Sequence, residues 1–114
     1  MAVAVLALAC LSCRARSLRA TCAENFGQGD YAAALPSCEK SYANTKSNED
    51  LYKVAVATLK MSSCPAGRPL LEAIPEGVHF VDVQLYLAYC DIRGDDQKEK
   101  GLQRVRLAMA RAED

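Results

Sequence analysis

Residues 29–40 of this 114-residue chain, Gly-Asp-Tyr-Ala-Ala-Ala-Leu-Pro-Ser-Cys-Glu-Lys, decide its fold class. Gly29 can adopt the left-handed backbone conformation that ends one helix, and Asp30 can cap the next. Pro36 lies inside this next helix, where its missing N–H group is expected to kink the early turns. The side chains that recur on one face of the helix are Tyr31, Ala34, Leu35, Cys38 and Tyr42. The stretch therefore predicts a helical hairpin.

The composition favours helices throughout the chain. Ala dominates the apolar residues, while Trp is absent and Phe occurs only twice, which is typical of closely packed helices and unlike a strand-rich sandwich. A chain of this length, with 51% apolar and 25% charged residues, is expected to build one domain with a modest core. We therefore expect a single all-α domain over residues 14–114.

A repeat of 34 residues runs through the sequence. Leu51-Tyr52 returns as Leu85-Tyr86, and Cys22 returns as Cys90 after twice that interval. A period of this length is typical of stacked antiparallel helical hairpins. Turn-forming residues follow these segments at similar distances, at positions 27–30, 65–67 and 94–96.

The stretch 29–40 is similar to the second helix of a tetratricopeptide repeat, in its turn Gly, the Tyr that follows and the small Ala residues that let helices approach. The chain thus resembles the tetratricopeptide (TPR or Sel1-like) family. This resemblance implies tandem antiparallel helical hairpins in a right-handed α-α superhelix, with repeats at about 14–45, 47–75 and 79–113. It also implies that a partner binds on the concave surface, which the first helices of the hairpins line.

The second repeat is degenerate. Ser47 and Asp50 are placed as a cap and its third-residue acid, and an apolar face follows at Leu51, Val54, Ala55, Thr58 and Leu59. Cys64-Pro65 is expected to end this helix, which leaves room only for a short partner helix from about Pro69.

The third repeat has two interpretations. Apolar residues alternate with others over residues 78–90, as in a half-buried strand, but the recurrence of Leu-Tyr favours a helix, and the choice stays open. A terminal capping helix is expected to follow, with an apolar stripe made by Leu102, Val105, Ala108 and Met109.

Residues 1–13, MAVAVLALACLSC, carry no charge, and every charged residue lies beyond them. The run is too short to span a bilayer, which needs about 20 residues, but it matches the apolar region of a secretory signal, although no Lys or Arg precedes it. The alternative is an N-terminal helix that packs on the first repeat. We expect an exported protein, in the cell envelope, the periplasm or the medium.

Leu6-Ala7-Leu8-Ala9-Cys10 resembles a bacterial lipoprotein box, in which the Cys receives a lipid. Cys10 is therefore a lipidation candidate that would attach the protein to a membrane, and plain cleavage of the signal is the alternative.

Six cysteines in a short exported chain predict disulfides. Cys22 and Cys38 come nearly level on the facing helices of the first hairpin, and the tetratricopeptide register also packs them together. Cys64 and Cys90 lie near corresponding ends of two first-type helices, which run side by side in a stacked array. We expect the pairs Cys22–Cys38 and Cys64–Cys90. The alternative is a reduced protein in which these residues are small buried side chains.

The sequence indicates no enzyme, cofactor or metal. Cys10-x-x-Cys13 has the spacing of a zinc or thiol-redox motif, but it lies in an apolar run without a second ligand pair. His79 is the single histidine and has no evident carboxylate or nucleophile near it, so a structural or solvent-facing role is expected. The contrasting hypothesis is a thiol-redox or metal-binding protein that uses the surplus cysteines. A third is a capping fragment of a longer repeat array.

The expected partner is a protein or a peptide. The 14 basic and 14 acidic residues balance, which argues against nucleic acid, and no small-molecule substrate is evident. In the tetratricopeptide register a mildly basic groove would suit an acidic or carboxylate-ended peptide, unless its charges are merely solvated. The residues expected to face this groove are Arg16, Arg19, Ala23, Phe26, Lys53, Ala57 and Lys60.

Overall fold

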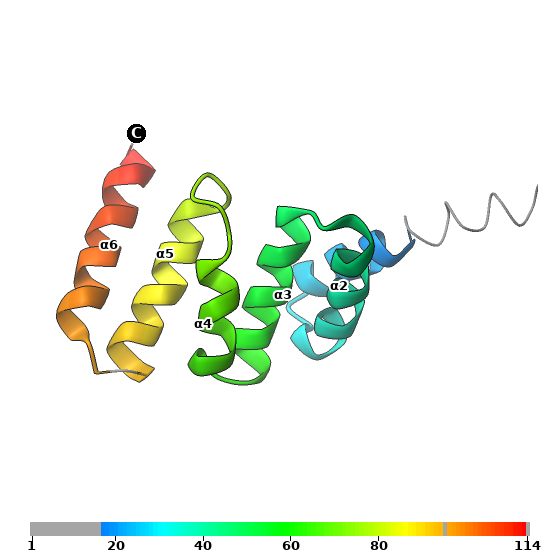
Figure 1. The fold of residues 1–114 in the computed structure, drawn as a ribbon, viewed down its shortest axis with the longest axis horizontal. Helices are drawn as coiled ribbons and strands as arrows, with labels where there is room; N and C mark the ends of the chain where they lie inside the picture. The colour runs from blue at the N-terminus through cyan, green and yellow to red at the C-terminus, as the bar shows by residue number, and fades with distance from the viewer. Residues whose placement is uncertain (1–16, 95, 114) are drawn as a thin grey trace, which may run out of the picture.

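A computed structural model of the chain describes residues 17–94 and 96–113, and all the regular structure in these ranges is helical. The helices stand side by side in a row and alternate in direction (Figure 1). None of these described helices is both long and apolar enough to cross a bilayer. The elements are a helix over residues 17–27, α2 (Tyr31–Thr45), α3 (Asn48–Met61), α4 (Cys64–Glu72), α5 (Phe80–Tyr89), a π-helical turn η1 (Cys90–Gly94) and α6 (Lys98–Glu113).

The expected all-α class is confirmed. Helix 17–27 pairs with α2, α3 with α4, and α5 with α6, so the chain forms tandem antiparallel hairpins. The strand interpretation of residues 78–90 is wrong, because α5 occupies most of that range. The alternation of apolar residues does not mark one buried face, since only Val83 and Leu87 of the alternating residues are buried.

The first hairpin turns where the sequence predicts it. Gly29 adopts the left-handed conformation with a φ of 74°. Asp30 Oδ1 accepts a hydrogen bond of 3.2 Å from the backbone N–H of Ala33 and so caps α2. The helix then continues through the exposed Pro36 to Thr45.

Two disulfides cross-link the row of helices. Cys22 is bonded to Cys38, with 4.6 Å between their Cα atoms, and Cys64 is bonded to Cys90, with 5.5 Å. These are the two pairs that the sequence predicts. The first bridge closes a hairpin, whereas the second joins α4 to the end of α5 and thus links two successive hairpins. Cys10 and Cys13 lie outside the described residues.

α4 begins earlier than expected. The sequence suggested that Cys64-Pro65 ends α3 and that a short helix starts near Pro69, but α3 ends at Met61 and α4 begins at Cys64. Ser63 Oγ caps α4 by accepting a hydrogen bond of 3.4 Å from the N–H of Ala66. The expectation was wrong because Pro65 lies in the first turn, where a missing N–H group removes no helical hydrogen bond.

α3 is the centre of the core. It contributes Leu51, Tyr52, Ala55 and Val56 to one apolar cluster, and Val54 to a second. The other buried members of the first cluster are Leu71, Ile74, Val83 and Leu87, and those of the second are Cys22, Ala34 and Cys38. Because neighbours cover α3 on two sides, only a narrow strip of it remains free.

A buried carboxylate fastens α3 to α2. Asp50 is 1% exposed and accepts hydrogen bonds from Ser41 Oγ at 2.8 Å and Thr45 Oγ1 at 2.6 Å. Burial raises the pKa of Asp50, but the hydrogen bonds outweigh burial and lower the pKa below its ordinary value. Asp50 therefore links two helices, in addition to the favourable place at a helix start that the sequence suggests.

A second buried carboxylate joins three elements. Asp91 of η1 is 0% exposed. Arg68 Nη1 of α4 donates to its Oδ1 at 2.8 Å, and Arg104 Nε of α6 donates to its Oδ2 at 2.7 Å. Burial raises the pKa of Asp91, but the hydrogen bonds and positive charges of the two arginines together lower it. The ionised carboxylate thus holds α4, η1 and α6 together.

α6 packs through smaller residues than expected. Gly101 is buried so tightly that a Cβ there would lie 2.5 Å from Ile92 Cγ1, and Ala108 is 1% exposed. Met109, which the sequence placed on the apolar stripe, is 59% exposed. The face of α6 that packs inward carries Gly101, Arg104 and Ala108, and Arg104 pairs with Asp91 from this face. Met109 lies outside this face.

Gly67 allows α4 to approach α3 closely. It is buried, and a Cβ at this position would lie 2.9 Å from Leu59 Cβ and 3.0 Å from Leu59 Cα. These atoms belong to the rigid part of α3, so they cannot move aside as the end of a flexible side chain would.

Asp91→Asn is expected to lower the free energy of unfolding by about 2–4 kcal/mol at pH 7, because both arginines lose their negative partner. Since folding lowers the pKa of Asp91, its contribution is present above the unfolded-state pKa of about 4 and is lost as the pH falls through the folded-state value. Urea unfolding of both proteins from pH 7 downwards should therefore show the difference shrinking in acid. Glu39→Gln, at an exposed position of α2, is the control. A difference that is constant with pH would contradict the ionic role.

Gly67→Ala is expected to destabilise the protein by about 1–3 kcal/mol, because the clash with α3 exceeds the gain in helix propensity. Gly77→Ala is the matched control, since a Cβ at Gly77 would have no atom within 4 Å. Thermal and urea unfolding measure both effects. Equal stability of Gly67→Ala and wild type would show that the two helices can move apart freely.

Candidate functional site

A hollow of about 380 Å³ opens between α3 and α5. These are the first helices of the second and third hairpins, and the hollow lies near their C-terminal ends. Its lining residues are Leu59, Lys60, Leu85, Tyr86 and Tyr89. We call this hollow the α3–α5 groove.

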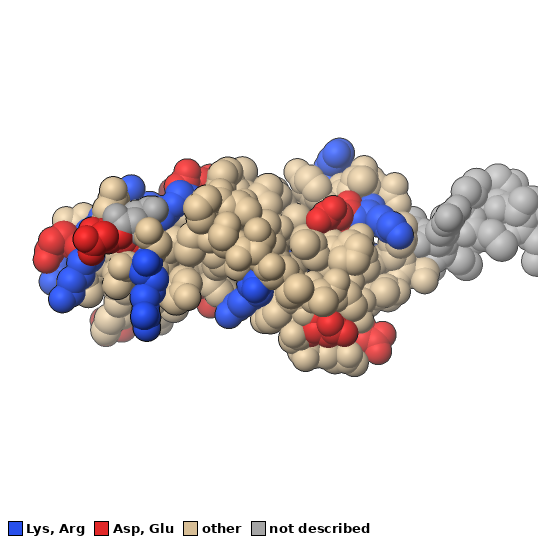
Figure 2. All heavy atoms as spheres, turned by 90° about the horizontal axis from the view of Figure 1, so that it is seen from below, with Lys and Arg blue, Asp and Glu red and all other residues tan. Residues whose placement is uncertain are grey.

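Large apolar side chains are exposed at the groove. Leu85 is 43% exposed and Tyr89 is 56% exposed. Figure 2 views the molecule from the side on which α3 and α5 end, and the middle of this surface carries few charged residues, whereas charges gather towards the α6 end. Exposed apolar residues that gather in this way are typical of an interaction surface.

Lys60 is the one charged residue in the groove lining. Its Nζ atom lies 5.5 Å from the ring centroid of Tyr86 and 5.9 Å from that of Tyr31, so the ammonium rests over two aromatic rings. Among the described residues, no carboxylate forms an ion pair with it. Burial raises the pKa of the Tyr86 phenol, and the nearby Tyr31 and Asp82 add to this rise, so its hydroxyl stays protonated at neutral pH. The groove therefore offers apolar surface and an ammonium free to take an anion.

A cluster at the opposite ends of the same helices sets how α5 meets α3. The His79 ring stacks on the Tyr52 ring with 4.0 Å between centroids, and His79 Nε2 lies 2.5 Å from Glu49 Oε1. The Tyr52 hydroxyl donates to Asp82 Oδ2 at 3.2 Å. Burial, and next the charge of Asp82, raise the pKa of Tyr52, so this donor also keeps its proton. The expectation that His79 has no carboxylate near it was wrong, because Glu49 is 30 residues away in sequence.

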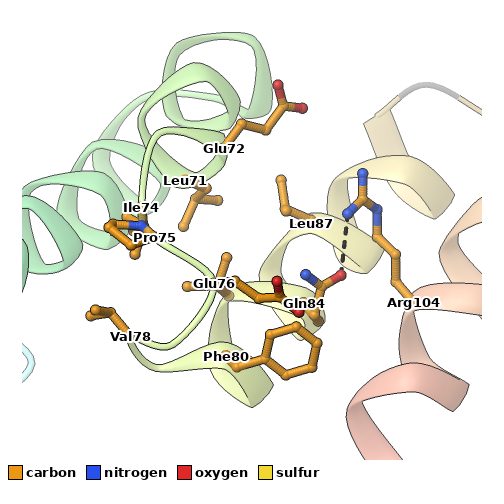
Figure 3. Close-up of a pocket in the computed structure, with 11 residues that line it drawn as sticks. Leu71, Glu72, Ile74, Pro75, Glu76, Val78, Phe80, Gln84, Leu87 and Arg104 are labelled. Atoms are coloured by element: carbon orange, nitrogen blue, oxygen red, sulfur yellow. Dashed lines mark hydrogen bonds between the residues drawn. The ribbon is translucent and has the colours of Figure 1, made fainter.

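A second hollow, of about 360 Å³, lies among α4, the 73–79 loop, α5 and α6 (Figure 3). Leu71, Val83 and Leu87 are buried at its base. Its cation, Arg104, is already engaged, since Nη1 donates to Gln84 Oε1 at 3.2 Å and Nε donates to Asp91. We therefore place the candidate site in the α3–α5 groove, where the cation has no acidic partner.

Of the residues predicted to face a groove, Lys60 is the one found in the lining. Arg19 is exposed on helix 17–27, Lys53 is partly buried on α3, and Arg16 lies outside the described residues. Phe26 packs against the core, edge-on to Tyr31 and Tyr52, and Ala57 is 0% exposed. Placing Ala57 in the groove was wrong, because its face of α3 is turned into the core, while Phe26 is partly buried and does not belong to the groove lining.

The sequence interpretation missed the groove residues of α5, namely Leu85, Tyr86 and Tyr89. One signal could have found them. All residues of α5 except Asp82 and Gln84 are apolar or aromatic, so the helix is apolar almost all round. A helix of this kind leaves an apolar surface exposed wherever neighbours do not surround it completely.

Comparison with known proteins identifies no relative. No family model, no curated protein and no solved structure matches this chain. The function of this protein must therefore be inferred from its own geometry.

Proposed function

We propose that this protein is a non-catalytic scaffold of tetratricopeptide type that holds a segment of a partner protein in the α3–α5 groove. The observation that carries the proposal is the pairing of exposed apolar side chains, Leu85 and Tyr89, with a Lys60 ammonium that has no acidic partner among the described residues. A surface of this composition is costly to leave in water and is suited to capture by a partner.

The chemistry of the groove indicates the class of segment. An acidic side chain or a terminal carboxylate would pair with Lys60, and a neighbouring apolar side chain would cover Leu85 and Tyr89. Tyr residues, such as Tyr86 and Tyr89 here, are among those that often supply most of the affinity at an interface. The proposed partner is therefore an acidic or carboxylate-ended peptide segment with an apolar residue beside the anion.

Export is the second part of the proposal. Its support is the apolar stretch 1–13 and the two disulfides, which persist in oxidising compartments outside the cytosol. Lipid attachment at Cys10 would hold such a scaffold at a membrane surface, where its groove would face partners of the envelope.

A peptide array with free C-terminal carboxylates tests the groove. We expect it to return peptides that carry an anion next to an apolar residue. Lys60→Gln and the pair Leu85→Ser with Tyr89→Ser should each weaken these peptides about tenfold or more. Lys40→Gln on α2 and Leu107→Ser on α6 are matched controls at exposed positions away from the groove. An array without selective binders, or binders that tolerate all groove variants, would overturn the proposal.

The intact mass of protein recovered from its native host, with and without reduction, tests export. We expect a mass that lacks the N-terminal residues, a gain of about four hydrogens on reduction from two disulfides, and an added lipid if Cys10 is modified. A full-length mass with six free thiols would contradict the proposal that the protein is exported.

A further inference from the structure

The two disulfides differ in how far a reagent can reach them. Cys22 and Cys38 are both 0% exposed, so their bridge is sealed within the first hairpin. Cys90 is also 0% exposed, but its partner Cys64 is partly exposed. Thiol–disulfide exchange requires an attacking thiolate to reach one of the two sulfur atoms. Of the four bridged cysteines, Cys64 is therefore the one residue that solvent partly reaches.

A glycine leaves the space beside Cys64 uncovered. Gly94 is exposed at the end of η1, and a Cβ at this position would lie 3.4 Å from Cys64 Cβ and 3.7 Å from Cys64 Sγ. These are ordinary contact distances, and the φ of Gly94 is outside the left-handed region, so an added Cβ would fit there without strain. A side chain at position 94 would place its Cβ in contact with Cys64 Sγ, where glycine has no atom.

The position of Cys64 in α4 assists the exchange. Cys64 is the first residue of the helix, directly after the capping residue Ser63. The N-terminal end of a helix carries a partial positive charge, which attracts an approaching thiolate and stabilises the Cys64 thiolate when the second step of the exchange releases it. Opening the bridge need not detach η1, since Arg68 and Arg104 still hold Asp91 beside Cys90.

We propose that the Cys64–Cys90 bridge is a site of thiol–disulfide exchange with low-molecular-mass thiols, and that Cys64 is the residue that they modify. The attacking thiolate forms a bond to Cys64 Sγ as the Cys64–Cys90 bond breaks. The electron pair of that bond leaves with Cys90 Sγ, which takes up the proton that the attacking thiol released. A second thiolate then attacks the small-thiol sulfur of the mixed disulfide and releases Cys64, so that one protein disulfide is reduced while two thiols are oxidised to one disulfide.

Reduced glutathione is the probe for the test, which uses the full chain in its folded, oxidised form at neutral pH. Samples are quenched with acid over time, free thiols are alkylated, and each cysteine peptide is followed by mass spectrometry. Glutathione adducts and new thiols should appear at Cys64 and Cys90 about tenfold or more faster than at Cys22 and Cys38. A variant with Cys10→Ser and Cys13→Ser prevents these two cysteines from exchanging with the bridges in place of glutathione.

Substitutions at Gly94 separate this site from general unfolding. Gly94→Leu should slow reduction of the Cys64–Cys90 bridge severalfold and leave the rate at Cys22–Cys38 unchanged, while Gly77→Leu, in open space, should change neither. Gly94→Ala is the milder variant should the Leu protein fail to fold, which circular dichroism would reveal.

Three outcomes would overturn the proposal. Equal rates at the two bridges would show that reduction follows unfolding of the whole chain. A glutathione adduct on Cys90 instead of Cys64 would show that the thiol attacks Cys90 Sγ. Unchanged kinetics in a folded Gly94→Leu protein would show that the space beside Gly94 is not the route of the thiol.

Discussion

The burial of α3 between its neighbours is the contact on which the rest of the structure depends. A row of helical hairpins has no single central core, because each helix touches only those beside it. In this row, α3 links the first hairpin to α4 and α5. α3 does so because its apolar residues occupy more than one face, with Val54 packed towards the first hairpin and Leu51, Tyr52 and Val56 towards α4 and α5.

Buried carboxylates and disulfides join neighbouring helices in addition to the apolar packing. Asp50 joins α2 to α3, and Asp91 joins α4, η1 and α6, each almost without exposure to water. Desolvation opposes the charge at both sites, and their lowered pKa values show that hydrogen bonds and, at Asp91, two arginines more than compensate. The Cys64–Cys90 disulfide links α4 to η1, as Asp91 does, and the Cys22–Cys38 disulfide links helix 17–27 to α2. A small domain with little buried surface gains most from such links.

The α3–α5 groove follows from this arrangement. α5 is apolar almost all round, but α6 and the core cover only part of it, so Leu85 and Tyr89 remain in contact with water. At the other ends of the same two helices, His79 stacks on Tyr52 and fixes how α5 meets α3. The groove is present without a bound segment, which lowers the cost of capturing a flexible one.

The sequence by itself determined the helical class and the first turn at Gly29 and Asp30, because capping, left-handed turns and helical periodicity act over a few residues. The two cysteine pairs were predictable because the hairpin turn and the resemblance to stacked helical repeats bring those positions level with each other. Only the tertiary structure decided which faces of the helices are buried. Ala57 entered the core, Phe26 packed partly buried against it and Met109 stayed exposed, since packing against distant elements sets the rotation of each helix. The partners of Asp91 and His79 could not be predicted from the sequence either, because Arg68, Arg104 and Glu49 lie 13 to 30 residues away along the chain. Such contacts exist only once the helices have stacked, and no local pattern records them.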